Sequence, residues 1–115
     1  MGAQEIMMEE INIFKVLDFI RDNSAAYAQA KANRQYLENY RKTVKAQQMK
    51  QHLSLPVSAQ EREAYASEEM QNTDKAIQAA QEEETRLYWL LTAAQIKAEA
   101  WRTLSANARI EARVL

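Results

Sequence analysis

The sequence predicts an all-α protein, folded as a long antiparallel helical hairpin of the coiled-coil type that assembles into an oligomeric helical bundle. Gly2 and Pro56 are the only glycine and proline in 115 residues, whereas a β-protein of this size needs many turns built from these residues. The strong helix formers Ala, Glu, Gln, Lys and Arg are abundant. Residues 70–108 also place small or apolar side chains at alternating steps of three and four, which is the spacing of a coiled-coil seam. The two rows of this seam are Met70, Ile77, Glu84, Leu91, Ala98 and Ser105, and Thr73, Ala80, Leu87, Ala94, Trp101 and Ala108.

The first predicted helix covers residues 4–22 and is apolar on more than one side. Ile13, Leu17 and Ile20 share one arc of the helix, and several large apolar side chains fall outside that arc. A helix with two apolar sides has two partners, and we expect one to be the C-terminal helix and the other a second subunit. The candidate oligomer interface comprises Met8, Ile11, Val16 and Phe19, together with Tyr88 and Trp89 of the long helix.

A second helix is predicted over residues 24–52. Asp22, Asn23 and Ser24 form a cluster typical of a helix start, because short polar side chains cap free backbone N–H groups. No glycine or proline lies near the cluster, so the two segments can also form one continuous helix. The sequence leaves both possibilities open.

The chain breaks at residues 53–57, where Pro56 cannot continue a helix. Ser58 and Glu61 have the spacing of a capping box, which predicts a short helix over 58–66. Ser67 offers a further start, and the long helix is predicted over 67–113. We expect residues 1–115 to form a single helical domain.

Charge is distributed as a hairpin would require. Residues 24–52 carry six basic and one acidic group, and residues 53–86 carry three basic and eight acidic groups. Residues 1–23 are net negative and residues 87–115 net positive, although the whole chain has a formal charge of only −1. Folding at Pro56 places opposite charges against each other, which selects the register of the helices more than it stabilises them.

The second helix carries a basic stripe within an arc of roughly 100°. The stripe consists of Tyr27, Lys31, Arg34, Arg41, Lys42 and Lys45. Such a row can follow a phosphate backbone, with the tyrosine stacked on a base. The alternative is that the stripe pairs inside the hairpin with acidic residues such as Glu69, Asp74 and Glu83.

Glu84 occupies a seam position where a leucine is expected. A carboxylate that is partly shielded from water stays ionised only with a cation close by. With the turn near Pro56, position 84 should face roughly the late twenties of the second helix, so Lys31 and Arg34 are the candidate partners, with Tyr27 as a neutral donor.

The residues give no sign of a catalytic, metal or cofactor site. There is no cysteine, His52 is the only histidine, and there is no glycine-rich phosphate loop. We therefore expect a protein that is not an enzyme and has no cofactor. The longest apolar run, residues 87–94, is shorter than the roughly 20 residues of a membrane span, and Glu5, Glu9 and Glu10 do not suit a signal peptide. These features predict a cytoplasmic protein without a membrane partner.

Three segments resemble a group of small helical proteins encoded by tailed bacteriophages and prophages. They are YLENYRKTVKAQQMK (36–50), LPVSAQEREAYA (55–66) and RLYWLLTAAQIKAEAWRTLSANAR (86–109), and the span from the first to the last covers about two-thirds of the chain. Members of that group tend to be encoded near single-strand-binding and recombination proteins. The resemblance implies an accessory protein in a bacterial host cell that binds a host or phage protein of DNA replication, recombination or host defence. Direct DNA binding and a purely structural oligomer are the alternatives.

Overall fold

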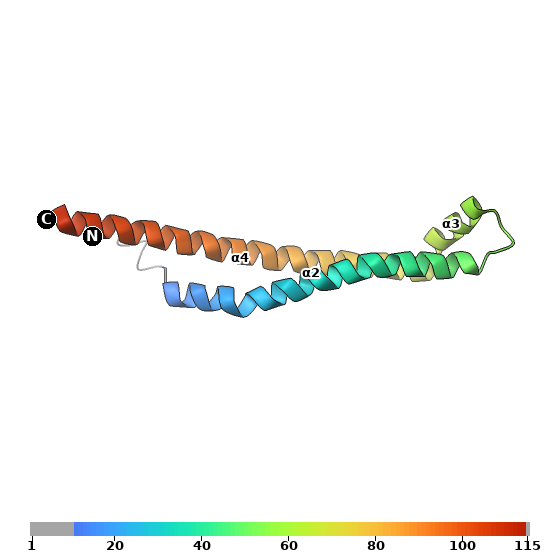
Figure 1. The fold of residues 1–115 in the computed structure, drawn as a ribbon, viewed down its shortest axis with the longest axis horizontal. Helices are drawn as coiled ribbons and strands as arrows, with labels where there is room; N and C mark the ends of the chain where they lie inside the picture. The colour runs from blue at the N-terminus through green and yellow to red at the C-terminus, as the bar shows by residue number, and fades with distance from the viewer. Residues whose placement is uncertain (1–10, 115) are drawn as a thin grey trace. The chain divides into compact units, whose positions relative to one another are not determined.

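The computed structural model describes residues 11–114, which form three helices and no strand (Figure 1). The helices are α2 (Ile13–Lys50), α3 (Val57–Ala66) and α4 (Glu68–Val114). The all-α prediction is therefore confirmed, and the chain reverses so that α2 and α4 pack antiparallel. Residues 4–10 of the first predicted helix lie outside the described residues.

Helix α2 runs without interruption through the cluster at residues 22–24. The Asn23 side-chain amide donates to the Phe19 carbonyl at 2.9 Å, and the Ser24 hydroxyl donates to the Ile20 carbonyl. Both side chains therefore bond back to the preceding turn of one continuous helix instead of capping the start of a new one. The helix start is capped by Asn12, whose side-chain oxygen accepts a hydrogen bond from the Lys15 N–H at 3.2 Å.

Helix α3 starts one residue earlier than predicted. Helix α3 begins at Val57, directly after Pro56, and no side chain caps it. The predicted capping box is wrong because Ser58 lies within the helix, where the Gln60 N–H already bonds to the Pro56 carbonyl at 2.9 Å. The predicted start at Ser67 is confirmed, since the Ser67 hydroxyl accepts from the Met70 N–H at 3.2 Å.

The chain divides into two compact units, and both long helices are continuous across the boundary. The turn unit comprises residues 28–85 and the terminal unit comprises residues 11–27 and 86–114 of the described chain. In the turn unit α2, α3 and the first half of α4 surround a small core. Its buried side chains are Val44, Gln48, Ala64, Met70, Thr73 and Ala80.

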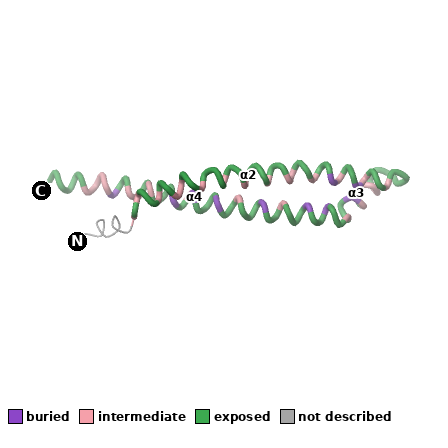
Figure 2. The backbone as a smooth tube through the Cα atoms, turned by 90° about the horizontal axis from the view of Figure 1, so that it is seen from below, coloured by how far each residue is buried: buried purple, intermediate pink, exposed green. Residues whose placement is uncertain are grey.

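The terminal unit contains the start of α2 and the second half of α4. Leu87, Leu91, Ala94 and Leu104 are buried on α4, and Phe19 and Ile20 are half-buried on α2. Buried positions recur along α4 at steps of three and four, with exposed residues between them (Figure 2). The predicted seam is confirmed at Leu87, Leu91 and Ala94, whereas buried Leu104 lies outside both predicted rows.

Candidate functional site

Members of the basic stripe lie on the face of α2 that packs against the rest of the protein. The half-buried and buried positions of α2 follow steps of three and four and include polar residues at several places where apolar ones are usual. This seam row is Ile20, Asn23, Tyr27, Ala30, Arg34, Leu37, Arg41, Val44 and Gln48. Three members of the stripe, Tyr27, Arg34 and Arg41, therefore belong to the seam.

Arg34 forms a bidentate ion pair with Glu84, as the sequence predicts. Arg34 Nη2 donates to Glu84 Oε1 at 3.1 Å, and Arg34 Nε donates to the other carboxylate oxygen. Arg34 Nη1 also donates to Glu38 at 3.0 Å. The side chains of Arg34 and Glu84 are only 22% and 14% exposed, so the pair is shielded from water.

The ion pair changes the titration of both groups. The hydrogen bonds from Arg34 lower the pKa of Glu84 below its ordinary value of 4.5, and the charge of Lys31 adds to this effect against the opposing effect of burial. Bonding to Glu84 raises the pKa of Arg34. Position 84 faces residue 34 instead of the late twenties, because α3 is inserted in the connection and shifts the register toward the turn.

Arg41 and Lys45 are held by a second set of contacts in the turn unit. Arg41 Nε donates to Asp74 at 2.6 Å, and Lys45 Nζ lies 3.5 Å from Glu61. Both cations also lie over the ring of Tyr65, at 5.4 Å and 5.0 Å from its centroid. Hydrogen bonding to Asp74 raises the pKa of Arg41, and hydrogen bonding to Tyr65 raises the pKa of Lys45.

The remaining members of the stripe are placed differently. Tyr27 is half-buried, and its ring lies 6.3 Å from that of Tyr88, so its face is covered on that side. Lys31 and Lys42 are exposed. The structure thus brings Arg34, Arg41 and Lys45 together with acids of the 53–86 segment, including the predicted Asp74, and leaves two lysines at the surface.

Three of the candidate interface residues of the terminal unit line an open groove between α2 and α4. Ile11, Val16 and Phe19 are half-buried along it, whereas Tyr88 and Trp89 are exposed, at 48% and 62%. Met8 lies outside the described residues. The Trp89 ring meets the edge of Tyr88 at 5.2 Å, so the two aromatics form one patch beside the groove.

The groove consists of two adjoining cavities of about 320 and 400 Å³ that share Lys15, Val16 and Lys97. Its floor is apolar and its edge carries two lysines. The residues that line the two cavities, taken together, are Ile11, Asn12, Lys15, Val16, Phe19, Leu90, Ala93, Ala94 and Lys97. The predicted site residues do not include Lys15, Leu90, Ala93 and Lys97, since the last three lie beside the seam rows of α4 and not on them.

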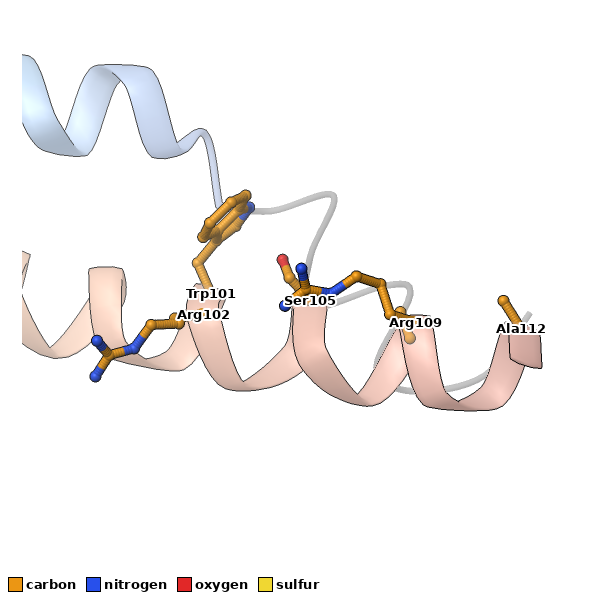
Figure 3. Close-up of a pocket in the computed structure, with 6 residues that line it drawn as sticks. Trp101, Arg102, Ser105, Arg109 and Ala112 are labelled. Atoms are coloured by element: carbon orange, nitrogen blue, oxygen red, sulfur yellow. The ribbon is translucent and has the colours of Figure 1, made fainter. Parts of the chain in front are cut away.

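A further cavity of about 460 Å³ lies along the seam face of α4 near its end. Trp101, Ser105, Ala108 and Ala112 continue the seam there, between Arg102 and Arg109. Figure 3 shows the Trp101 ring projecting from one side of α4 and the Arg109 side chain extending toward Ser105, whereas Arg102 points away.

No group of three His, Cys, Asp or Glu side chains within residues 11–114 is placed to hold a metal ion. Among the helices of the described residues, none is long and apolar enough to cross a membrane. Comparison with known protein families, curated proteins and solved structures gave no match to this chain.

Proposed function

We propose that this chain is a non-enzymatic binding protein that captures a segment of another protein in the groove of the terminal unit. The observation that supports the proposal is the combination of an apolar floor, formed by side chains such as Val16, Phe19 and Leu90, with Lys15 and Lys97 at the edge. Leu90 is 42% exposed, so the floor is open to a partner.

The chemistry of this groove suits an amphipathic helix that carries acidic residues. Such a helix places apolar side chains at steps of three and four into a groove, and its flanking carboxylates meet the two lysines. The Tyr88–Trp89 patch extends the apolar surface, and aromatic side chains of this kind frequently supply most of the energy of a protein interface.

The resemblance to phage proteins supplies the proposed setting. We assign the chain to the cytoplasm of a bacterial host, as a phage accessory protein whose partner belongs to DNA replication, recombination or host defence. Direct DNA binding is the second candidate, and it rests on exposed Lys31 and Lys42. It is less favoured because Arg34, Arg41 and Lys45 already have anionic partners within the chain. A purely structural oligomer is the third candidate.

The proposal is tested by affinity capture from host lysate with matched variants. Leu90→Asp, and separately Lys15→Glu with Lys97→Glu, change the floor and the edge of the groove. Leu53→Asp is the control, since Leu53 is 72% exposed outside the groove and receives the same chemical change. We expect one partner to be retained by the wild type and the control, and to be reduced at least about tenfold by both groove variants.

Circular dichroism checks that each variant keeps its helix content. A partner that the Leu90→Asp chain retains as well as the control does would show that the groove is not its binding surface. If neither host nor phage-infected lysate yields a partner, the protein-binding function is contradicted.

A further inference from the structure

Helix α4 carries a second seam on the face opposite the one that packs against α2. Its residues alternate at steps of four and three, as in a coiled coil, and none is charged: Ile96, Ala100, Thr103, Asn107, Ile110 and Val114. Ile96 and Val114 lie about 180° around the helix from buried Leu87. Ile96, Ile110 and Val114 are 63%, 58% and 81% exposed, whereas Ala100 and Asn107 are half-buried. We call these six residues the outer seam.

The outer seam is confined to the second half of α4. The same spacing continues through Ala93 and Trp89, and then meets Arg86, Glu82, Ala79 and Lys75 in turn. The N-terminal half of this helix face is therefore charged, as expected for a surface in water. The apolar part is long enough for about three heptads, or roughly 27 Å of helix.

We infer that the outer seam binds the outer seam of a second copy of this chain, antiparallel about a two-fold axis near Ser105. In that register Ile96 meets Val114 of the second copy, and Ala100 meets Ile110 of the second copy. Large and small side chains are then opposed in each layer. Thr103 meets Asn107 of the second copy, so each polar side chain has a hydrogen-bonding partner.

The charges that flank the outer seam select this arrangement. Lys97 and Glu111 lie along one edge, and Glu99 and Arg113 lie along the other. In an antiparallel pair, residues on the same edge meet, so Lys97 faces Glu111 of the second copy and Glu99 faces Arg113 of the second copy. The two-fold axis repeats both pairs.

Other arrangements lack this complementarity. In a parallel pair, Glu99 faces Leu104 of the second copy and Lys97 faces Thr92 of the second copy. An antiparallel pair shifted by one heptad opposes Asn107 and Ile96 and forms no opposite-charge pair. Glu99 bonds to Arg102 at 2.6 Å within the chain, but both side chains are more than two-thirds exposed, so this pair can exchange for Arg113 of a second copy at little cost.

Charge reversal on the full-length chain tests the assignment. We expect the wild type to reach twice its mass of 13.3 kDa in sedimentation equilibrium at micromolar concentration. Glu99→Arg opposes two arginines, and Arg113→Glu opposes two glutamates, so each alone should weaken the dimer about tenfold or more. The double variant restores opposite charges and should restore the dimer. Lys75→Glu, a charge reversal outside the outer seam, should leave the mass unchanged.

The two-fold axis is tested by a disulfide, because the natural chain has no cysteine. Ala106 lies on one edge of the outer seam and meets Ala106 of the second copy in this register alone. Ala106→Cys should therefore form a cross-linked dimer under mild oxidation, whereas the control Gln78→Cys in the turn unit should not. A wild-type monomer, failure of the double charge variant to recover, or no cross-link from Ala106→Cys would each overturn the inference. Lys97 belongs both to the groove lining and to the edge of the outer seam, so the variants used here are at Glu99, Arg113 and Ala106, which do not line the groove.

Discussion

The polar residues of the α2 seam determine how this helix can pack. Arg34 and Arg41 occupy positions where leucine is usual, and each meets a carboxylate from α4. A shifted register would leave Arg34, which is only 22% exposed, shielded from water without a partner, which is strongly unfavourable, whereas the more exposed Arg41 would lose less. The ion pairs therefore specify one alignment of the two helices, while most of the favourable energy comes from the buried apolar side chains.

The Arg34–Glu84 pair makes stability depend on pH. Since the folded chain holds the pKa of Glu84 below its ordinary value of 4.5, the ionised carboxylate stabilises the fold above about pH 4.5, and this contribution is lost as the pH falls through the lowered pKa. We expect Glu84→Gln to lower the melting temperature at pH 7, because the charged half of the bidentate pair with Arg34 is lost. The difference from the wild type should shrink steadily below pH 4.5.

Thermal melts of the wild type and of the Glu84→Gln variant from pH 7 to pH 3 measure the difference in melting temperature. Glu82→Gln applies the same chemical change to an exposed residue of α4 and should alter the melting temperature little. A Glu84→Gln difference that stays constant with pH would show that the carboxylate charge does not stabilise the fold.

At the scale of the helices, stability depends on a narrow buried row. Leu87 is 3% exposed in the terminal unit, whereas Leu53 is 72% exposed in the loop after α2. Leu87→Ala should lower the free energy of unfolding by about 2–5 kcal/mol through lost burial and the remaining cavity. Leu53→Ala should change it by less than about 0.5 kcal/mol. Urea denaturation followed by circular dichroism measures both values, and equal values would contradict the assigned core.

Much of this helical arrangement can be predicted from the sequence, for physical reasons that also explain the errors. The seam of α4 is predictable because burial repeats with the helical period, and the Arg34–Glu84 pair because a shielded carboxylate needs a cation. The continuity of α2 at Asn23 and Ser24 cannot be predicted, since the same side chains can either cap the start of a helix or bond to carbonyls of the preceding turn within one. The groove is not predictable, because Leu90 and Lys97 lie beside the seam. Whether side chains beside a seam are covered or open depends on the distance between the two helices, which the sequence pattern does not give.

At the scale of the whole molecule, the pattern of charge explains which function is favoured. The basic 24–52 segment and the acidic 53–86 segment nearly neutralise each other, and three of the six basic-stripe residues are engaged by acids of the latter segment. Large apolar side chains stay exposed in both units, for example Trp89 and Ile96 in the terminal unit and Tyr36 and Leu53 in the turn unit. This distribution favours protein partners over nucleic acid.

Titration against DNA tests that central claim most directly. Fluorescently labelled single- and double-stranded oligonucleotides are titrated with the wild-type chain at about 50 mM salt, a condition that favours phosphate contacts. We predict no saturable binding in the micromolar range, because Arg34, Arg41 and Lys45 are occupied by Glu84, Asp74 and Glu61. Saturable binding that weakens steeply with added salt, and that is lost when Lys31 and Lys42 are changed to Glu with helix content unchanged, would contradict the account.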